Sequence, residues 1–502
     1  MEKKKKIIII GAGPGGLSAA MLLSHRGFDV TVYEKDGQVG GRSQSYEMGG
    51  YLFDAGPTFL LMKFILDEVF SESGAHVEDY MKCTRLDPMY KIYFQDLVFE
   101  LTDDTQLMQE RIEKTFGEGE GFLKFINREK KRFWKMFPCL QKPYGSVKDF
   151  FDWNLIKALP HLSLGRSMYD ELGLYFKDER LKMSFTFHSK YIGMSPWECP
   201  AYFMILPYME HAFGIYHVEG GLAQIAKGMA KVAEENGAKI HLNTPVKELI
   251  IENKTVRGVM LENGETVHAD ETIINADFAY AMTALAKGKT KKYTPEKLAK
   301  KQYSCSTLMF HWGLDGILDL PHHSFFPSKD YKQFTHTLFK EFKVSPDISF
   351  YVRNASVTDS TLAPSGKSSL YILVPVPNNL SKIDWEKDKK QYRDLVLSIL
   401  EKRLGIKNLE KRIEVEKIVT PQDWQEDHNV YLGATFSMAH TVNQMIYFRP
   451  HNKFEEFEHC YLVGGGTHPG SGLPTIWESA RITSNLISKT HKVPFASHNL
   501  HV

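Results

Sequence analysis

The N-terminal sequence KIIIIGAGPGG places four isoleucines, Ile7–Ile10, directly before a glycine-rich turn. The apolar core of a secretory signal is about 7–15 residues long, so this run is too short for one and instead predicts a buried strand of a parallel sheet. Gly11, Gly13 and Gly16 follow in GxGxxG spacing. These glycines permit a tight turn, close approach of the backbone to a pyrophosphate, and close packing of a helix on the strand. The stretch therefore predicts the first unit of a dinucleotide-binding Rossmann fold.

Two features after this loop narrow the choice of nucleotide. The run DVTVYE predicts the next strand and ends in Glu34. An acidic residue at that point hydrogen-bonds ribose hydroxyls and repels a 2′-phosphate, which favours FAD or NAD over NADP. A second glycine pair with an arginine, Gly40-Gly41-Arg42, brings backbone amides and a cation to a further part of an elongated cofactor. A nicotinamide enzyme has no use for such a group there, so we predict that Glu34, Gly41 and Arg42 bind FAD.

The composition of the chain excludes several other classes of protein. Its 502 residues include 62 Lys and Arg against 61 Asp and Glu, so no global field attracts nucleic acid. The five cysteines are scattered without CxxC or Cys/His ligand spacing, which fits reduced thiols of a cytosolic protein and predicts no metal site. No apolar run approaches the length of about 18 residues that a spanning helix needs. We therefore expect a cytoplasmic protein that is soluble or membrane-peripheral.

The C-terminal run YLVGGGTHPGSGLPTIWESARI is the most specific motif of the chain. Together with GAGPGG, GGR and DAGPT near the N-terminus, it resembles the bacterial phytoene desaturase type. These are FAD-dependent carotenoid desaturases, including the C30 4,4′-diapophytoene branch, of the amine oxidase-like flavoprotein superfamily. Many superfamily members have an acidic residue where this chain has Gly464–Gly466, and carotenoid desaturases tend to have small residues there. The resemblance implies bound FAD and adds these cofactor-binding residues: Gly56, Pro57, Thr58, Val246, Gly465, Gly466 and Thr475.

The C-terminal loop and the helix after it have a physical rationale at the flavin. The helix predicted to begin near Thr475 has free amides and partial positive charge at its N-terminus. At the pyrimidine edge it would stabilise the anion of reduced flavin without any charged side chain. Gly465 and Gly466 let the backbone approach the ribityl–pyrophosphate part. For Val246 the resemblance implies backbone contact with the adenine, and an ordinary core valine is the alternative left open.

The rest of the chain alternates in character, which predicts an α/β plus α+β fold. Residues 222–268 indicate a helix, a strand and an antiparallel meander with Asn263-Gly264 as a hairpin turn. The strands STLMFHWGL, DISFYVRNAS and SLYILVPVP favour a mixed or antiparallel sheet with one face lining an apolar cavity. We expect a discontinuous Rossmann-type FAD-binding domain and an inserted substrate domain with that sheet and helices. The first comprises residues 1–85, 216–284 and 447–502, and the second residues 86–215 and 285–446.

One segment has the composition of a membrane contact. Residues 130–162, KKRFWKMFPCLQKPYGSVKDFFDWNLIKALPHL, interleave lysine and arginine with phenylalanine and tryptophan. Cations and aromatic rings both favour the headgroup region, so one interpretation is an interfacial helix or lid on the inner face of the cell membrane. The other is an ordinary helical pair packed on the substrate domain, and the sequence leaves both open.

These features together predict a desaturase that introduces double bonds into an acyclic C30 or C40 polyene, 4,4′-diapophytoene or phytoene. A hydride passes to flavin, and a proton leaves the resulting allylic cation, which is acidic enough to need no potent base. No His/Asp pair or carboxylate dyad stands out, and we interpret Glu219 as a salt-bridge or helix-start charge, so no catalytic side chain is predicted. No second GxGxxG occurs in a strand–helix context, which leaves oxygen or a membrane quinone as the electron acceptor.

The same fold admits two alternative functions. A carotenoid terminal-methyl oxygenase of the diaponeurosporene type, or a carotenoid isomerase, would share the cofactor motifs, although GTHPGSGLP resembles the desaturases more. The architecture also serves non-enzymatic prenyl-lipid-binding escort proteins without flavin, and intact Glu34, Arg42 and Gly466 count against that alternative. Among substrates, the C30 series is preferred because the C-terminal run is more similar to that branch.

Overall fold

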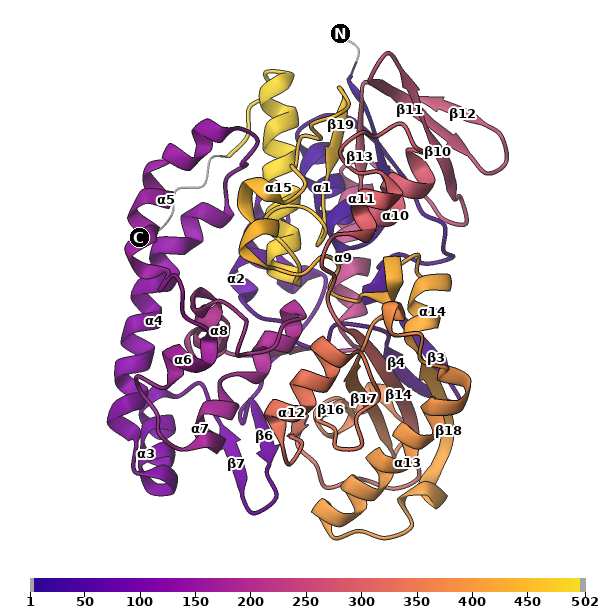
Figure 1. Cartoon of the computed structure of the whole chain (residues 1–502). Helices are drawn as coiled ribbons and strands as arrows, with labels where there is room; N and C mark the ends of the chain where they lie inside the picture. The colour runs from indigo at the N-terminus through magenta and orange to yellow at the C-terminus, as the bar shows by residue number, and fades with distance from the viewer. Residues whose placement is uncertain (1–3, 497–502) are drawn as a thin grey trace.

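The computed structural model describes residues 4–496, and Figure 1 shows a parallel sheet around β13 and β19 in the upper half and a second sheet at the lower right. Within the described residues the parallel sheet has the order β19-β13-β1-β2-β9, and all neighbouring pairs are parallel. Its strands are β1 (Lys6–Ile10), β2 (Asp29–Tyr33), β9 (Lys239–His241), β13 (Glu271–Ile274) and β19 (Cys460–Leu462).

The isoleucine run of β1 is continuous because both faces of this sheet are buried. The first and third isoleucines pack in a core with helices, and the second and fourth pack in a core with an antiparallel meander. The helices are α1 (Pro14–His25), α2 (Lys63–Glu72), α9 (Ala223–Glu235) and α15 (Leu473–Thr490). The meander consists of β10 (Val246–Glu252), β11 (Thr255–Leu261) and β12 (Thr266–His268), joined where the Asn-Gly turn was predicted.

The second sheet joins strands from both predicted parts of the substrate domain. It has seven strands in the described residues, antiparallel except for the parallel pair β15–β6, which fits the predicted mixed sheet. In spatial order these are β18 (Ile413–Val419), β14 (Ser306–Leu314), β17 (Ser368–Val376), β16 (Phe350–Asn354), β15 (His323–Phe326), β6 (Tyr90–Tyr93) and β7 (Val98–Leu101). Helix α13 (Trp385–Leu404) packs in the core on one face of this sheet.

Helices form a layer at the left in Figure 1 that runs beside both halves of the structure. They are α3 (Thr105–Phe116), α4 (Gly119–Leu140), α5 (Trp153–Ala158), α6 (Met168–Leu172), α7 (Glu179–Ser184) and α8 (Ile205–Phe213). The remaining elements are β3 (Ser45–Met48), β4 (Tyr51–Asp54), β5 (Cys83–Arg85), β8 (Tyr216–Val218), α10 (Phe278–Tyr280), α11 (Pro295–Ala299), α12 (Tyr331–His336) and α14 (Pro421–Glu426). Parallel and mixed sheets with their helices agree with the predicted α/β plus α+β class.

We propose the division into two discontinuous domains that the sequence predicts, because each sheet draws its strands from the corresponding segments. A buried ion pair joins the two parts. Arg353 Nη1 of β16 donates to Asp54 Oδ2 at the end of β4 at 2.6 Å, and the two residues are 3% and 4% exposed. Asp54 also accepts hydrogen bonds from the backbone N–H groups of Leu222 and Ala223 at the start of α9. One carboxylate therefore ties β4, β16 and α9 together.

Replacing the arginine of this pair is expected to destabilise the whole chain. Arg353→Met leaves the Asp54 carboxylate buried without its cation, and removing one partner of a buried pair costs about 3–5 kcal/mol. Urea unfolding followed by tryptophan fluorescence measures the loss. The matched control is Lys82→Met, which breaks the exposed pair between Lys82 and Glu219 and should leave the midpoint almost unchanged. Equal midpoints for wild type and Arg353→Met would show that the pair does not join the domains.

Candidate active site

A large cavity lies along the carboxyl edge of the parallel sheet. Its volume is about 570 Å³. Gly11 follows β1, Glu34 follows β2, Asn275 follows β13 and Gly464 lies just beyond β19, and all four line the cavity. Ligands of open α/β sheets bind outside the carboxyl ends of the strands. The position of the cavity therefore identifies it as the candidate site.

The first glycine loop requires glycine at two positions. Gly11 has a φ of +96°, and a Cβ there would lie 2.9 Å from the carbonyl oxygen of Asn275. A Cβ on Gly16 would lie 2.2 Å from the carbonyl oxygen of Gly11, so this glycine lets α1 approach β1. Gly13 caps α1 and lines the cavity, whereas Gly16 does not line it. The loop therefore presents the N-terminus of α1 to the cavity, as a pyrophosphate needs.

Glu34 turns its carboxylate back onto this loop. Its Oε2 accepts a hydrogen bond from Ala12 N at 2.7 Å, and its Oε1 accepts one from Asp36 N at 2.9 Å. The side chain is buried, and burial raises the pKa of Glu34 against the effect of the two N–H donors. Each carboxylate oxygen can accept a further hydrogen bond, so the group fits the ribose hydroxyls for which it was predicted.

Asn275 is a site residue that the sequence analysis missed. Its Nδ2 donates to the carbonyl oxygen of Gly11 at 3.0 Å, and its side chain lies against Gly15 and Gly464. It therefore connects the N-terminal glycine loop with the C-terminal one. The available signal was its place directly after β13, which pairs with β1. A polar residue at that strand end faces the ligand edge of the sheet.

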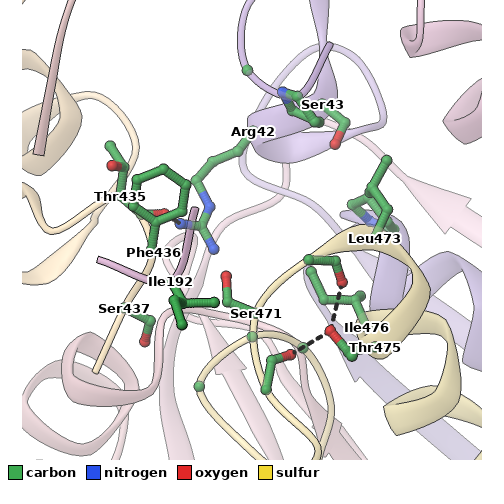
Figure 2. A pocket seen from close by; sticks show the side chains of 18 of the residues that line it. Arg42, Ser43, Ile192, Thr435, Phe436, Ser437, Ser471, Leu473, Thr475 and Ile476 are labelled. Carbon is green, nitrogen blue, oxygen red and sulfur yellow. Dashed lines mark hydrogen bonds between the residues drawn. The ribbon is translucent and has the colours of Figure 1, made fainter. Parts of the chain in front are cut away.

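Arg42 reaches across the cavity toward the segment of Thr435 and Phe436 (Figure 2). Its Nη1 donates to the carbonyl oxygen of Thr435 at 2.7 Å. Burial lowers the pKa of Arg42 and raises the pKa of Asp277, and the opposite charges of the two groups counteract both shifts. Both residues line the cavity. The structure thus brings the predicted cation to the cavity and adds Asp277 as a countercharge that the sequence analysis did not identify.

The DAGPT turn forms part of the wall between the parallel sheet and the second sheet. Gly56, Pro57 and Thr58 all line the cavity. The Tyr371 hydroxyl donates to the carbonyl oxygen of Gly56 at 2.7 Å, and the Tyr351 hydroxyl lies 3.0 Å from Thr58 Oγ1. Two tyrosines of the second sheet therefore hold the turn in place.

The C-terminal loop leads into α15, which begins at Leu473, two residues before the predicted Thr475. Figure 2 shows the Thr475 hydroxyl bonded within the loop: it lies 3.1 Å from the carbonyl oxygen of Gly470 and 2.9 Å from that of Gly472. The hydroxyl is therefore engaged by the loop itself. What this helix start offers the cavity is its free backbone N–H groups and its partial positive charge.

A buried arginine lies behind this loop and was not predicted. Arg449 is 0% exposed, and its guanidinium donates to the carbonyl oxygens of Gly465 at 2.6 Å and Thr467 at 3.1 Å. Burial lowers the pKa of Arg449 to about 9, so the group is cationic at neutral pH. Arg449 does not line the cavity, so the expectation that the loop itself acts on the flavin without a charged side chain stays a prediction. Nothing in the local sequence YFRP distinguishes this arginine from a surface one.

The cavity continues as an apolar arm over one face of the second sheet, as the strand pattern predicts. Cross-strand register places Met309, Leu373 and Tyr351 side by side on β14, β17 and β16. Thr307 and Pro375 lie two residues further along, on the same face. All five line the cavity. Further apolar residues of this arm are Ile92, Met136, Phe137, Leu140, Met183, Phe187, Phe203, Leu206, Phe325 and Trp424.

One amine interrupts the apolar arm. Lys190 lines it, with Nζ 4.6 Å from the ring centroid of Tyr331 and 5.3 Å from that of Phe334. Burial lowers the pKa of Lys190 to about 7. A substantial fraction of these side chains is therefore uncharged near neutral pH.

A buried polar cluster adjoins the arm on the side of β4. His323 of β15 is paired with Arg353 of β16, two residues along the strands from the pair of Phe325 and Tyr351. Arg353 also contacts His217 Nδ1 at 3.2 Å, and His217 Nε2 lies 2.8 Å from Asp359 Oδ2. The structure thus contains a buried His/Asp pair that the sequence analysis did not find. We name as the polar cluster the residues Asp54, His217, His322, His323, Arg353 and Asp359.

Glu219 lies outside the site. Its carboxylate is 48% exposed and pairs with Lys82 at 2.7 Å, so the salt-bridge interpretation of this residue agrees with the structure. Of the predicted cofactor residues, all except Gly16 line the cavity: Gly11, Gly13, Glu34, Gly41, Arg42, Gly56, Pro57, Thr58, Val246, Gly465, Gly466 and Thr475. Glycine amides, a ribose-type carboxylate and a helix start on one cavity fit an extended dinucleotide cofactor.

Removing the Glu34 carboxylate is expected to weaken FAD binding. Glu34→Ala deprives both the ribose and two backbone N–H groups of an acceptor, which costs about 1–3 kcal/mol and corresponds to about 5- to 150-fold in Kd. Titration of apoprotein with FAD, followed by flavin fluorescence, gives the Kd. Glu219→Ala removes a surface carboxylate and is the control. An unchanged Kd for Glu34→Ala would place the adenosine elsewhere.

Comparison with known proteins agrees with this geometry. The family model described as flavin containing amine oxidoreductase matches residues 14–488. The chain is 52% identical over 497 residues to 4,4′-diapophytoene desaturase (4,4′-diapolycopene-forming) of a Methylomonas species, covering 99% of this chain and 97% of that one. It is 35% identical to all-trans-zeta-carotene desaturase of Myxococcus xanthus, covering 97% and 93% of the two chains.

A solved structure of an oxidoreductase from Methanosarcina mazei shares the fold. It superposes with a TM-score of 0.65 at 18% identity, over 95% of this chain and 98% of that one. The family match begins within the first glycine loop, at residue 14, and includes the whole C-terminal glycine loop. The chain therefore belongs to the flavin-containing amine oxidoreductases, in their carotenoid desaturase group, and is an oxidoreductase with FAD as its cofactor.

Proposed function

We propose that this protein desaturates the acyclic C30 polyene 4,4′-diapophytoene, with 4,4′-diapolycopene as the end product. The observation that supports the proposal most is that one cavity combines the predicted cofactor residues with an arm lined by apolar side chains. The named activity of the relative at 52% identity supports the C30 chain length and the product. The thirteen predicted cofactor residues are proposed as the FAD site.

The residues that line and support the cavity have three roles in this reaction: they bind the cofactor, place positive charge near it and hold the hydrocarbon. FAD, when bound, supplies the acceptor for a hydride. The glycine loops, Glu34 and Arg42 hold it at the carboxyl edge of the sheet, and the start of α15 with Arg449 places positive charge behind the C-terminal loop. The apolar arm orients the hydrocarbon and excludes water, so that the carbocation formed by hydride loss is not captured by hydroxide or water.

Two rival functions differ from desaturation in their products. A terminal-methyl oxygenase would form aldehydes at the chain end, and an isomerase would change double-bond geometry without adding conjugation. A flavin-free lipid-binding protein would do neither. The named activities of both curated relatives described above favour the desaturase.

Expression in cells that make 4,4′-diapophytoene or phytoene tests the function. Chromatography of extracted pigments is expected to show hydrocarbons that absorb at longer wavelength, and the number of conjugated double bonds gives the number of steps. Gly16→Val, whose side chain would strike the carbonyl oxygen of Gly11, is the matched variant and should form no pigment. Terminal aldehydes with unchanged conjugation would instead assign the protein as an oxygenase.

We also propose that the segment after α4 contacts the membrane surface. Six apolar side chains there are exposed, up to 78% for Phe151 and 64% for Trp153, and the exposed ring of Phe448 lies 6.2 Å from that of Phe150. We name these seven the apolar patch: Val147, Phe150, Phe151, Trp153, Ile156, Leu159 and Phe448. Lys157 lies over the ring of Trp153, which supplies a cation beside it. Met136 of α4 lines the cavity and packs in one cluster with Leu155 and Ala158 of α5, so the helix that presents Trp153 and Ile156 lies beside a wall of the cavity. Such a position suits a substrate that resides in a bilayer.

The electron acceptor is proposed to be oxygen or a membrane quinone. In residues 4–496 none of the helices is both long and apolar enough to cross a membrane. Contact through the apolar patch would bring the cavity to the lipid phase in which quinones reside.

Charged substitutions in the apolar patch are expected to weaken vesicle binding. Burying one large apolar side chain stabilises by about 1.5–3 kcal/mol, so the double variant Phe151→Glu, Trp153→Glu should bind about 100-fold or more weakly. Co-sedimentation with phosphatidylglycerol vesicles measures this, and FAD content verifies folding. Ile317→Glu, at another exposed apolar residue, is the control. Equal binding of all three proteins would favour the helical-pair interpretation of this segment.

A further inference from the structure

A tyrosine hydroxyl separates the cavity from a buried imidazole beside Thr58. Tyr351 Oη lies 3.0 Å from Thr58 Oγ1 and 2.7 Å from His323 Nδ1. Tyr351 and Thr58 line the cavity, whereas His323 stands behind them and is 1% exposed. The hydroxyl therefore has one side toward the substrate space and the other toward the histidine.

The hydrogen-bonding capacity of this group permits proton transfer in one direction. A hydroxyl has one proton, so Tyr351 donates to one neighbour and accepts from the other, and the Thr58 hydroxyl can serve as the donor. Burial, with the charge of Arg353 nearby, lowers the pKa of His323 well below its ordinary value, so the ring is neutral. With its proton on Nε2, an atom for which no partner exists within the described residues, His323 has Nδ1 free to accept from Tyr351.

The two side chains are held rigidly in this arrangement. They lie on the paired strands β15 and β16, where Phe325 is opposite Tyr351. The His323 ring stacks on Phe59 with centroids 4.3 Å apart, and the Tyr351 ring packs against Phe325 at 5.1 Å. A fixed acceptor of this kind needs no reorganisation when the proton arrives.

We propose that Tyr351 Oη accepts the proton that the polyene loses, while its own proton passes to His323 Nδ1. The inference rests on the proposed desaturase function. The C–H bond next to the cationic carbon breaks, and its electron pair becomes the new π bond. An O–H bond forms at Tyr351 as the original one breaks, and an N–H bond forms at His323. FAD, when bound, would supply the acceptor for the hydride lost from the neighbouring carbon.

A neutral pair suits this place better than a carboxylate. An ionised carboxylate in an apolar arm has a large desolvation cost, whereas the tyrosine–histidine pair provides basicity without a resident charge. The carboxylates of the cavity lining lie elsewhere: Glu34 and Asp36 at the end of β2, Asp277 beside Arg42, and Glu478 on α15. An allylic cation is a strong acid, so a weak base in a fixed position is sufficient.

Anaerobic rapid mixing of holoprotein with 4,4′-diapophytoene in vesicles tests the proposal through the bleaching of flavin absorbance. Tyr351→Phe and His323→Asn are each expected to slow bleaching about 100-fold, a typical contribution of general base catalysis. FAD content and melting temperature should remain those of the wild type. Tyr51→Phe, which removes a buried hydroxyl that contacts Glu414 outside the cavity, is the matched control and should bleach at the wild-type rate.

The two variants separate proton transfer from positioning. Asparagine keeps an oxygen near the place of Nδ1 and can hold Tyr351 in position, but it cannot take the proton. A wild-type rate for His323→Asn would therefore overturn the relay and leave His323 a positioning residue, and a wild-type rate for Tyr351→Phe would overturn both roles. If substrate does not bleach the flavin absorbance of the wild type, the proposed desaturase function is wrong, and the hydrogen bond between Tyr351 and His323 is then tested separately.

The contact can be measured without turnover. In protein labelled with ¹⁵N at histidine, the Nδ1 signal of His323 is identified by its loss in His323→Asn. Tyr351→Phe is expected to shift this signal, because the hydrogen bond to Nδ1 is removed. An unchanged signal would overturn the proposed pairing whatever the substrate.

Discussion

The pairing of Asp54 with Arg353 determines how the two walls of the cavity face each other. Asp54 ends β4, and Arg353 lies on β16 of the second sheet, with 2.6 Å between Oδ2 and Nη1. The walls meet again where Tyr351, two residues before Arg353 on β16, contacts Thr58 in the turn after β4. Two polar contacts, one ionic and one neutral, therefore fix the position of the DAGPT turn relative to the second sheet.

The same carboxylate explains the second glycine of the pair before α9. Asp54 accepts the first amides of this helix, and Gly221, at a φ of +90°, has no room for a Cβ, which would lie 2.7 Å from Asp54 Oδ1. Three motifs that are far apart in the sequence thus meet at one group. A charge buried at such a junction is stable only with all its partners present, which couples the folding of the two parts.

The distribution of charge divides the cavity into two ends. Arg42, Asp277 and Glu34 lie at the cofactor end, with Arg449 behind the loop. On the second sheet the polar and the apolar regions meet between two neighbouring cross-strand pairs. Arg353 and His323 form the pair in the polar cluster, and Tyr351 and Phe325, two residues further along the strands, form the pair that lines the arm. Because strand residues two apart share a face at a spacing of about 7 Å, the environment changes from ionic to apolar within one step of the strands. Tyr351 stands at this boundary.

The local sequence predicted the glycine loops, turns and helix starts of the site well, and it predicted the contacts between distant side chains poorly. Gly11 to Gly16, the Asn263-Gly264 turn and the start of α15 have signals within a few residues, because turns and helix ends are decided locally. The β1 run was readable as a strand because both of its faces are buried. Arg449 and the pair of His217 with Asp359 carry no such signal, since 142 positions separate the members of that pair. Only the tertiary fold brings such residues to their partners.

A hydrocarbon has no polar group by which a protein can hold it, so its position must follow from the shape of the arm. Each buried methylene contributes about 0.8 kcal/mol, which favours any apolar placement equally and selects none. What distinguishes one carbon from the next is where the arm stops being apolar. At Tyr351 the apolar arm reaches Thr58 of the DAGPT turn, and the polar cluster lies beyond this contact. Desolvating those groups is unfavourable, so we expect the polyene to run along this boundary rather than across it, with its C–H bonds beside Tyr351.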